Sequence, residues 1–97
     1  MAQAYILELG NVMTAANGSI QIADLDSVIV DQPPVVFPGT SLSFSMGTRF
    51  IRVDVDATCS FKYNGVPVAN TNSRIPQNQT EYFKVSPGST ISFVASN

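Results

Sequence analysis

Residues 79–94 read QTEYFKVSPGSTISFV and contain the clearest fold signal in the chain. Two runs rich in β-branched and aromatic residues flank the tetrapeptide Ser86-Pro87-Gly88-Ser89. Proline at the second turn position fixes φ, and glycine at the third supplies the positive φ that a type II turn requires. The stretch therefore predicts a β-hairpin with one strand on each side of this turn.

Working outward from this stretch, apolar and polar side chains keep alternating with a period of two. In residues 49–56, Ile51, Val53 and Val55 fall on one face of the expected strand, and polar side chains fall on the other. Residues 41–46 and 59–63 alternate in the same way, so we expect strands there too. The side chains expected to face the core are Leu42, Phe44 and Met46 in the first run and Cys59, Phe61 and Tyr63 in the second.

The N-terminal half contains further β-rich runs separated by turn residues. Residues 3–9 and 19–30 form two such runs, and the second is expected to bend near residues 24–26. Prolines then bracket Val35-Val36-Phe37, which predicts an edge strand or a crossover because proline cannot donate to a ladder. Residues 64–78 form the longest loop, and loops of that length are usually functional or flexible.

The expected architecture is all-β. Seven to eight short strands with Pro, Gly and Asn turns predict a single domain over residues 1–97, a small antiparallel β-sandwich or jelly roll. An open meander or a small barrel is the alternative. A chain of 97 residues forms only a thin core, so we expect modest stability or stability shared with neighbours.

Charge and hydropathy exclude several classes of partner. The net charge is −2 and charged residues make up 12% of the chain, with no basic stripe for a phosphate backbone, so we expect no nucleic-acid partner. No apolar run approaches the roughly 18 residues of a membrane span, so we expect no membrane partner. Glu8 interrupts the apolar run near the N-terminus and no basic residues precede it, so we expect no signal peptide.

The residues that usually perform catalysis are nearly absent. The chain has no histidine, and its one cysteine, Cys59, lies in a predicted core position. Asp54 and Asp56 share a strand face, where solvation is the simplest interpretation. Neither that pair nor Asp24 with Asp26 supplies the six or more oxygens of a calcium site. We therefore expect no enzyme, no metal and no cofactor.

Three segments resemble a known class of protein. Residues 48–53, 56–59 and 79–88 are similar to small virion proteins of tailed bacteriophages encoded near capsid genes, and the likeness covers residues 48–94. The resemblance implies a head decoration, cement or stabilisation protein that binds the major capsid protein. It also implies a virion location on the capsid surface, after synthesis in the host cytoplasm.

We expect such a protein to bind through apolar side chains in turn-rich segments and to form a homo-oligomer, a dimer or a trimer. The same side chains can instead cap the open ends of the sandwich, and the sequence leaves these two roles open. The candidate interface residues are Val35, Val36, Phe37, Val66, Val68 and Ile75.

A small carbohydrate-binding β-sandwich module is the rival interpretation. Such modules stack sugars on exposed aromatic rings. The chain has no tryptophan, and most of its aromatic residues alternate in phase with core positions. Tyr5 and Tyr82 remain as candidate platforms.

Overall fold

A computed structural model describes residues 2–14, 21–71 and 73–97 of the chain. Its elements are β1 (Gln3–Leu9), β2 (Val12–Thr14), β3 (Gln21–Ala23), the 3-10 helix η1 (Leu25–Ser27), β4 (Val28–Asp31), β5 (Val35–Val36), β6 (Gly39–Thr40), β7 (Phe50–Val55), β8 (Cys59–Tyr63), β9 (Arg74–Ile75), β10 (Thr80–Lys84) and β11 (Ile91–Ala95).

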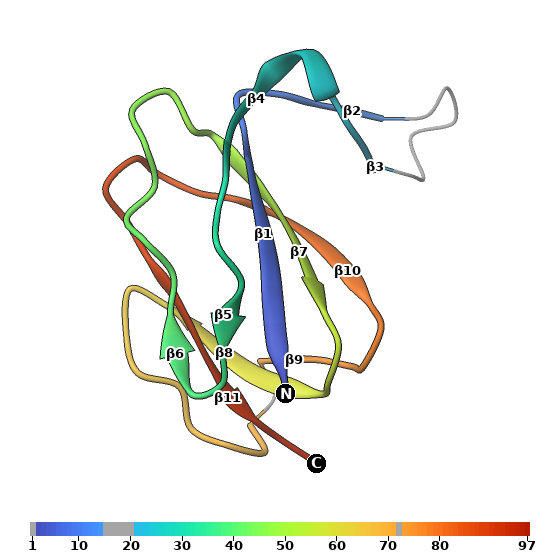
Figure 1. The fold of residues 1–97 in the computed structure, drawn as a ribbon, viewed down its shortest axis with the longest axis vertical. Helices are drawn as coiled ribbons and strands as arrows, with labels where there is room; N and C mark the ends of the chain where they lie inside the picture. Colours follow the sequence, from blue (N-terminus) through green and yellow to red (C-terminus); the bar gives the residue numbers. More distant parts are fainter. Residues whose placement is uncertain (1, 15–20, 72) are drawn as a thin grey trace.

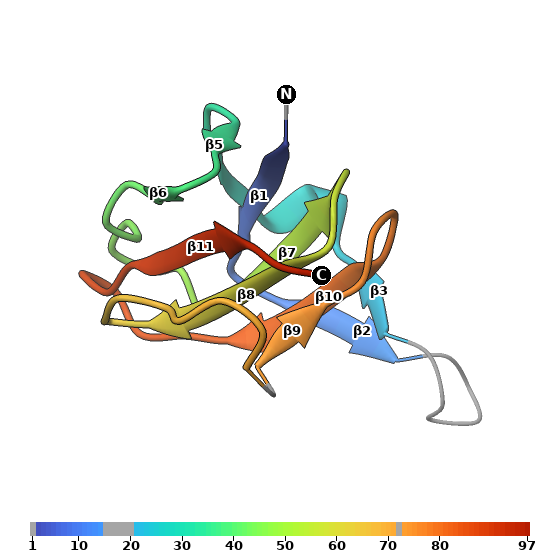
Figure 2. The ribbon, with the colours of Figure 1, turned by 90° about the horizontal axis from the view of Figure 1, so that it is seen from below.

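The strands form two antiparallel sheets that pack as a sandwich. Within the described residues, one sheet has five strands in the order β10-β7-β1-β4, with β5 also paired to β1, and the other has four in the order β6-β11-β8-β9. The β2–β3 hairpin projects from the body of the sandwich (Figures 1 and 2). The predicted small antiparallel β-sandwich is confirmed. The described strands exceed the expected seven or eight because β5, β6 and β9 are two-residue strands.

The core lies between the two sheets, and β7 contributes to it as predicted. Ile51, Val53 and Val55 are buried, whereas Arg52 and Asp54 are half-buried on the opposite face. Pairing with β1 on one side and β10 on the other makes β7 a central strand. The buried core residues are Ala4, Ile6, Val35, Phe44, Ile51, Val53, Val55, Cys59, Ile75, Val85, Ile91 and Phe93.

The predicted hairpin at residues 79–94 is wrong, although its turn is correct. Gly88 has the expected positive φ of 82°. However, β10 pairs with β7 in one sheet, and β11 pairs with β6 and β8 in the other. The backbone of Phe44 lies against the turn, accepting a hydrogen bond from Gly88 N and donating one to Ser89 O. The turn therefore connects the two layers of the sandwich.

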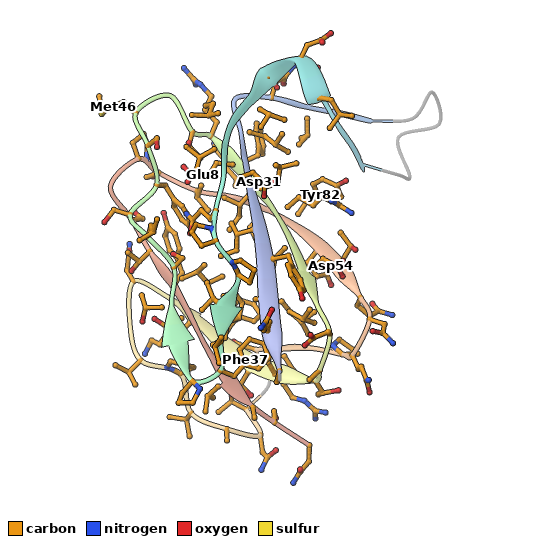
Figure 3. All side chains as sticks on the ribbon, viewed as in Figure 1. Glu8, Asp31, Phe37, Met46, Asp54 and Tyr82 are labelled. Atoms are coloured by element: carbon orange, nitrogen blue, oxygen red, sulfur yellow. The ribbon has the colours of Figure 1, made fainter. Side chains whose placement is uncertain are left out.

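The predicted strand over residues 41–46 is also wrong. This segment is irregular, and of its three expected core residues only Phe44 is buried. Leu42 is 60% exposed, and Met46 is 87% exposed at the tip of the loop (Figure 3). Ser41 N donates to Ile91 O of β11, but further along the segment the backbone nitrogens of Leu42 and Ser45 bond to side chains, so no continuous ladder imposes the alternation of a sheet.

The strand at residues 59–63 follows its predicted alternation only in part. Cys59 is buried and Phe61 packs against the core, as expected. Tyr63 instead points outward at 41% exposure, and its hydroxyl accepts a hydrogen bond from Ser86 N at 2.8 Å. Ser60, expected outside, is buried. Tyr63 therefore stabilises the turn between the layers.

Two further predictions are confirmed. The bend near residues 24–26 is η1, whose N-cap Asp24 accepts a hydrogen bond from Asp26 N at 3.1 Å. The segment Val35-Val36-Phe37 contains the edge strand β5, which pairs with β1. The segment at residues 64–78, expected to be the longest loop, also contains the two-residue strand β9.

We expect Gly88→Val to destabilise the protein by more than about 1 kcal/mol. A Cβ at residue 88 would meet no atom within 4 Å, so the cost comes from the positive φ alone. Thermal unfolding followed by circular dichroism measures this difference. Gly88→Asn should cost less, because asparagine tolerates the left-handed region.

Ser86→Ala is the matched control in the same turn. Its side chain is exposed, and Tyr63 contacts its backbone nitrogen, so we expect a change below about 0.5 kcal/mol. Equal and small effects of Gly88→Val and Ser86→Ala would contradict a strained position at residue 88.

Candidate interaction surface

Two shallow apolar grooves lie on either side of the edge strand β6. One has a volume of about 290 Å³ and the other about 240 Å³, and both are lined by Gly39 and Thr40. We call the side chains and backbone around these grooves the β6 surface. It comprises Pro34, Val36, Gly39, Thr40, Leu42, Val66 and Pro67.

The segment 35–40 forms this surface because it crosses from one sheet to the other. β5 pairs with β1 and β6 pairs with β11, so the turn between them spans the sandwich. The ring of Phe37, labelled in Figure 3, stacks on that of Phe93 in β11, with centroids 5.6 Å apart. A Cβ at Gly39 would lie 2.4 Å from the carbonyl oxygen of Val36, so the turn requires glycine at that position.

Apolar side chains on the β6 surface are unusually accessible. Val36 is 41% exposed, Leu42 is 60% exposed and Val66 is 84% exposed. Val68, 68% exposed, lies in an adjoining depression with Val66 and Pro67 against β8. Single exposed apolar residues are common, but several from separate segments around one strand are typical of a contact surface.

The structure divides the six candidate interface residues into three groups by exposure. Val36, Val66 and Val68 are exposed, and the first two lie on opposite sides of β6. Val35 and Ile75 are buried core residues because their strands pair with β1 and β8, so their expected role in an interface is corrected. Phe37 is half-buried against the core and serves mainly to cap the sandwich.

A buried carboxylate supports this region, and sequence reasoning missed it. Glu8 is 1% exposed on β1 (Figure 3) and accepts hydrogen bonds from Ser45 N and Thr48 Oγ1, both at 2.8 Å. The side chain of Gln32 donates to Glu8 Oε2 at 2.9 Å. Gln32 also bonds the backbone nitrogen and oxygen of Leu42, at 3.0 and 3.2 Å. Glu8 and Gln32 together hold the loop that presents Leu42.

One signal in the sequence points to Glu8. With the period of two that defines β1, Glu8 falls in phase with Ala4 and Ile6, which are both buried. A carboxylate in a core phase requires several donors, because an unsatisfied buried charge is costly. Assigning charged residues, as well as apolar ones, to the two faces of the strand would have identified this position.

Three of the titratable groups that sequence reasoning considered, Cys59, Asp56 and Asp24, have structural roles. Cys59 is buried, and burial raises the pKa of its thiol to about 11, so it is a poor nucleophile. Asp56 Oδ1 accepts a hydrogen bond from Gln3 N at 2.7 Å, and Asp24 caps η1. Over the described ranges, no group of three or more His, Cys, Asp or Glu side chains is placed to hold a metal ion.

Two further observations bear on the class of protein. No helix in the part of the chain that the structure describes is long and apolar enough to cross a membrane. Comparison with protein-family models, with curated proteins and with solved structures finds no match to this chain. The proposals that follow therefore depend on the geometry of the chain and on the resemblance of residues 48–94.

Proposed function

We propose that the chain is a structural protein of a bacteriophage virion that decorates or cements the capsid through multivalent protein–protein contacts. The observation that carries this proposal is the β6 surface, where exposed apolar side chains from two separate segments flank one edge strand. The resemblance of residues 48–94 to phage virion proteins supplies the class of partner, the major capsid protein.

The charge of the chain supports this kind of contact. Five basic and seven acidic residues are the only charges available to a 97-residue protein. The side chains on the β6 surface are apolar or hydroxyl-bearing, so binding should depend weakly on salt. A protein that contacts several neighbouring capsid subunits at once gains affinity through multivalency, without a large interface at each contact.

Removing the protein from the virion tests the proposal directly. We expect particles made without it to assemble but to lose their genome at lower temperature or under milder osmotic shock. The reason is that a ligand binding only the assembled state stabilises that state by mass action. Adding the purified protein back should restore stability in both low and high salt. Particles of undiminished stability in its absence would contradict a cementing role.

We expect Val66→Asp and Val36→Asp to weaken attachment to the shell by about tenfold or more without unfolding the protein. Each change places a carboxylate in an apolar groove that the partner would desolvate. Cosedimentation of the purified variants with shells measures attachment, and circular dichroism verifies the fold. Val28→Asp is the matched control, since Val28 is 39% exposed and lies outside the β6 surface. Attachment equal to that of the unchanged protein would exclude this surface.

A carbohydrate-binding role is the second candidate, and one observation favours it. The strand register places Tyr5 and Tyr82 on the same outer face of the five-stranded sheet, where Tyr5 pairs with Asp54 and Tyr82 with Arg52. Figure 3 labels Tyr82 and Asp54. Two aromatic rings beside an acid and a guanidinium suit stacking and hydroxyl recognition. Quenching of tyrosine fluorescence by oligosaccharides, lost in Tyr5→Ala, would support this role.

A further inference from the structure

The strand β10 ends the five-stranded sheet opposite β4 and β5. Its hydrogen-bonded neighbour is β7. In Figure 1 it lies at the right margin, on the opposite side of the molecule from β6. With five residues, Thr80–Lys84, it is longer than the other strands at the sheet edges among those described. An uncovered edge of this length is a template for pairing with another strand.

The pairing with β7 defines which backbone groups of β10 point outward. Val85 N donates to Arg49 O at 2.9 Å, and Val55 N donates to Gln79 O at 3.3 Å, so the odd-numbered positions bond toward β7. In an antiparallel pair the bonded positions alternate, so Thr80, Tyr82 and Lys84 direct their N–H and C=O groups away from β7. No other described element bonds these groups.

We propose that β10 pairs with β10 of a second copy of this chain, antiparallel, about a two-fold axis that passes beside Tyr82. Tyr82 then lies opposite Tyr82 of the second copy, and Thr80 lies opposite Lys84. About six backbone hydrogen bonds form, and they use the outward groups of all three residues on both strands. The two five-stranded sheets become one continuous sheet, an isologous contact typical of homodimers.

The sequence of β10 favours this register over its neighbours. It pairs all five residues of each strand, and it places Glu81 opposite Phe83 and Lys84 opposite Thr80. A two-fold axis at Glu81 would place the two Glu81 side chains directly opposite each other, and an axis at Lys84 would do the same for the two lysines. Like charges directly opposite each other destabilise a strand pair. An axis at Phe83 would leave Thr80 opposite Ser86, beyond the end of the strand.

One like-charge pair remains in the proposed register, and its effect is small. The two Glu81 carboxylates lie diagonally across the contact, about 8 Å apart from strand geometry. That separation is close to the Debye length of about 8 Å at physiological ionic strength, so salt screens most of the repulsion. Dimerisation should accordingly strengthen slightly as salt increases.

The dimer does not depend on the proposed function, but it would explain how the protein binds the capsid multivalently. Because β6 and β10 lie on opposite sides of the molecule (Figure 1), pairing through β10 leaves the β6 surfaces free at the two ends of the dimer. If the virion role is correct, each dimer has two capsid contacts, and multivalent binding follows from the symmetry. Failure of capsid binding would leave the dimer test unaffected.

Cysteine crosslinking tests the dimer and its register together. Bonded antiparallel residues have Cα atoms about 5.5 Å apart, within the range that a disulfide spans. We expect Tyr82→Cys to crosslink to itself under mild oxidation. Thr80→Cys and Lys84→Cys should each stay uncrosslinked alone but should crosslink when the two are mixed. The unchanged chain, whose one cysteine is buried, is the control.

Sedimentation measures the association itself. At high concentration we expect a particle of twice the chain mass of 10.4 kDa. Tyr82→Lys places two lysines opposite each other across the contact, so we expect it to weaken dimerisation by about tenfold or more. A strict monomer at hundreds of micromolar would overturn the proposal. A dimer that crosslinks through Lys84→Cys alone would also overturn it. The same holds for a dimer that crosslinks when Tyr82→Cys is mixed with Lys84→Cys but does not crosslink through Tyr82→Cys alone. Both results would place the two-fold axis away from Tyr82.

Discussion

We expect Glu8→Ala to lower the free energy of unfolding by about 3 kcal/mol or more. The substitution removes the acceptor of three hydrogen bonds, from Ser45 N, Thr48 Oγ1 and Gln32 Nε2, in a site that is almost fully buried. Each unsatisfied buried donor costs about 1–3 kcal/mol. For a chain of this size the midpoint should fall by roughly 12 °C or more. Calorimetry or denaturant unfolding measures the change.

Two controls separate the hydrogen bonds of Glu8 from its charge and its volume. Glu8→Gln keeps the shape and one acceptor but turns an amide toward the amide of Gln32, so we expect an intermediate loss of stability. Asp31→Asn removes an exposed carboxylate and should change stability by less than about 0.5 kcal/mol. Hydrogen exchange should also quicken at Ser45 N in Glu8→Ala. Unchanged exchange there would contradict the role of Glu8 in holding the loop.

The sequence predicted the strands whose environment is itself periodic. β7 is paired on both sides and covered on one face, so alternation in residues 50–55 corresponds to alternation in burial. Residues 41–46 alternate equally well, yet their backbone bonds to the side chains of Glu8 and Gln32. A local pattern contains no information about a partner 37 residues away, which is the separation between Glu8 and Ser45.

Turn chemistry was predictable in the same local sense, whereas strand partners were not. Ser86-Pro87-Gly88-Ser89 forms a turn with the expected positive φ at Gly88. The two strands beside it diverge into different sheets because β7 and β8 are already available as partners, and Phe44 bonds to the turn. Local sequence therefore determines the turn, whereas strand pairing across the whole sandwich determines which sheet each strand joins.

The candidate surface was only partly predictable for a similar reason. Val36 and Val66 are apolar residues in turn-rich segments, and both are exposed as expected. Val35 and Ile75 have the same kind of neighbours in sequence, but two-residue strands pair them with Ala4 and Cys59 in the core. Such short pairings leave no periodic pattern. The grouping of segments 33–42 and 66–67 around β6 is likewise a result of tertiary structure.

The second large effect is expected for Val53→Asp, which should abolish cooperative unfolding and leave the chain unfolded at 25 °C. Val53 is 0% exposed at the centre of β7, between Ile6 on β1 and Glu81 on β10. An unpaired buried carboxylate costs several kcal/mol. A domain of this size has a total stability of only about 5–15 kcal/mol. Far-UV circular dichroism and the dispersion of amide resonances report the loss of the sheets.

Val66→Asp makes the same chemical change at a side chain that is 84% exposed, so it should alter stability by less than about 0.5 kcal/mol. The two variants differ only in whether the folded chain removes the carboxylate from water. A folded Val53→Asp protein would show that the core of the sandwich admits water beside β7, contrary to the burial described above. A Val66→Asp protein that unfolds would show that the loop over β8 and β11 belongs to the core, and the β6 surface would then have no exposed apolar side chain on that side.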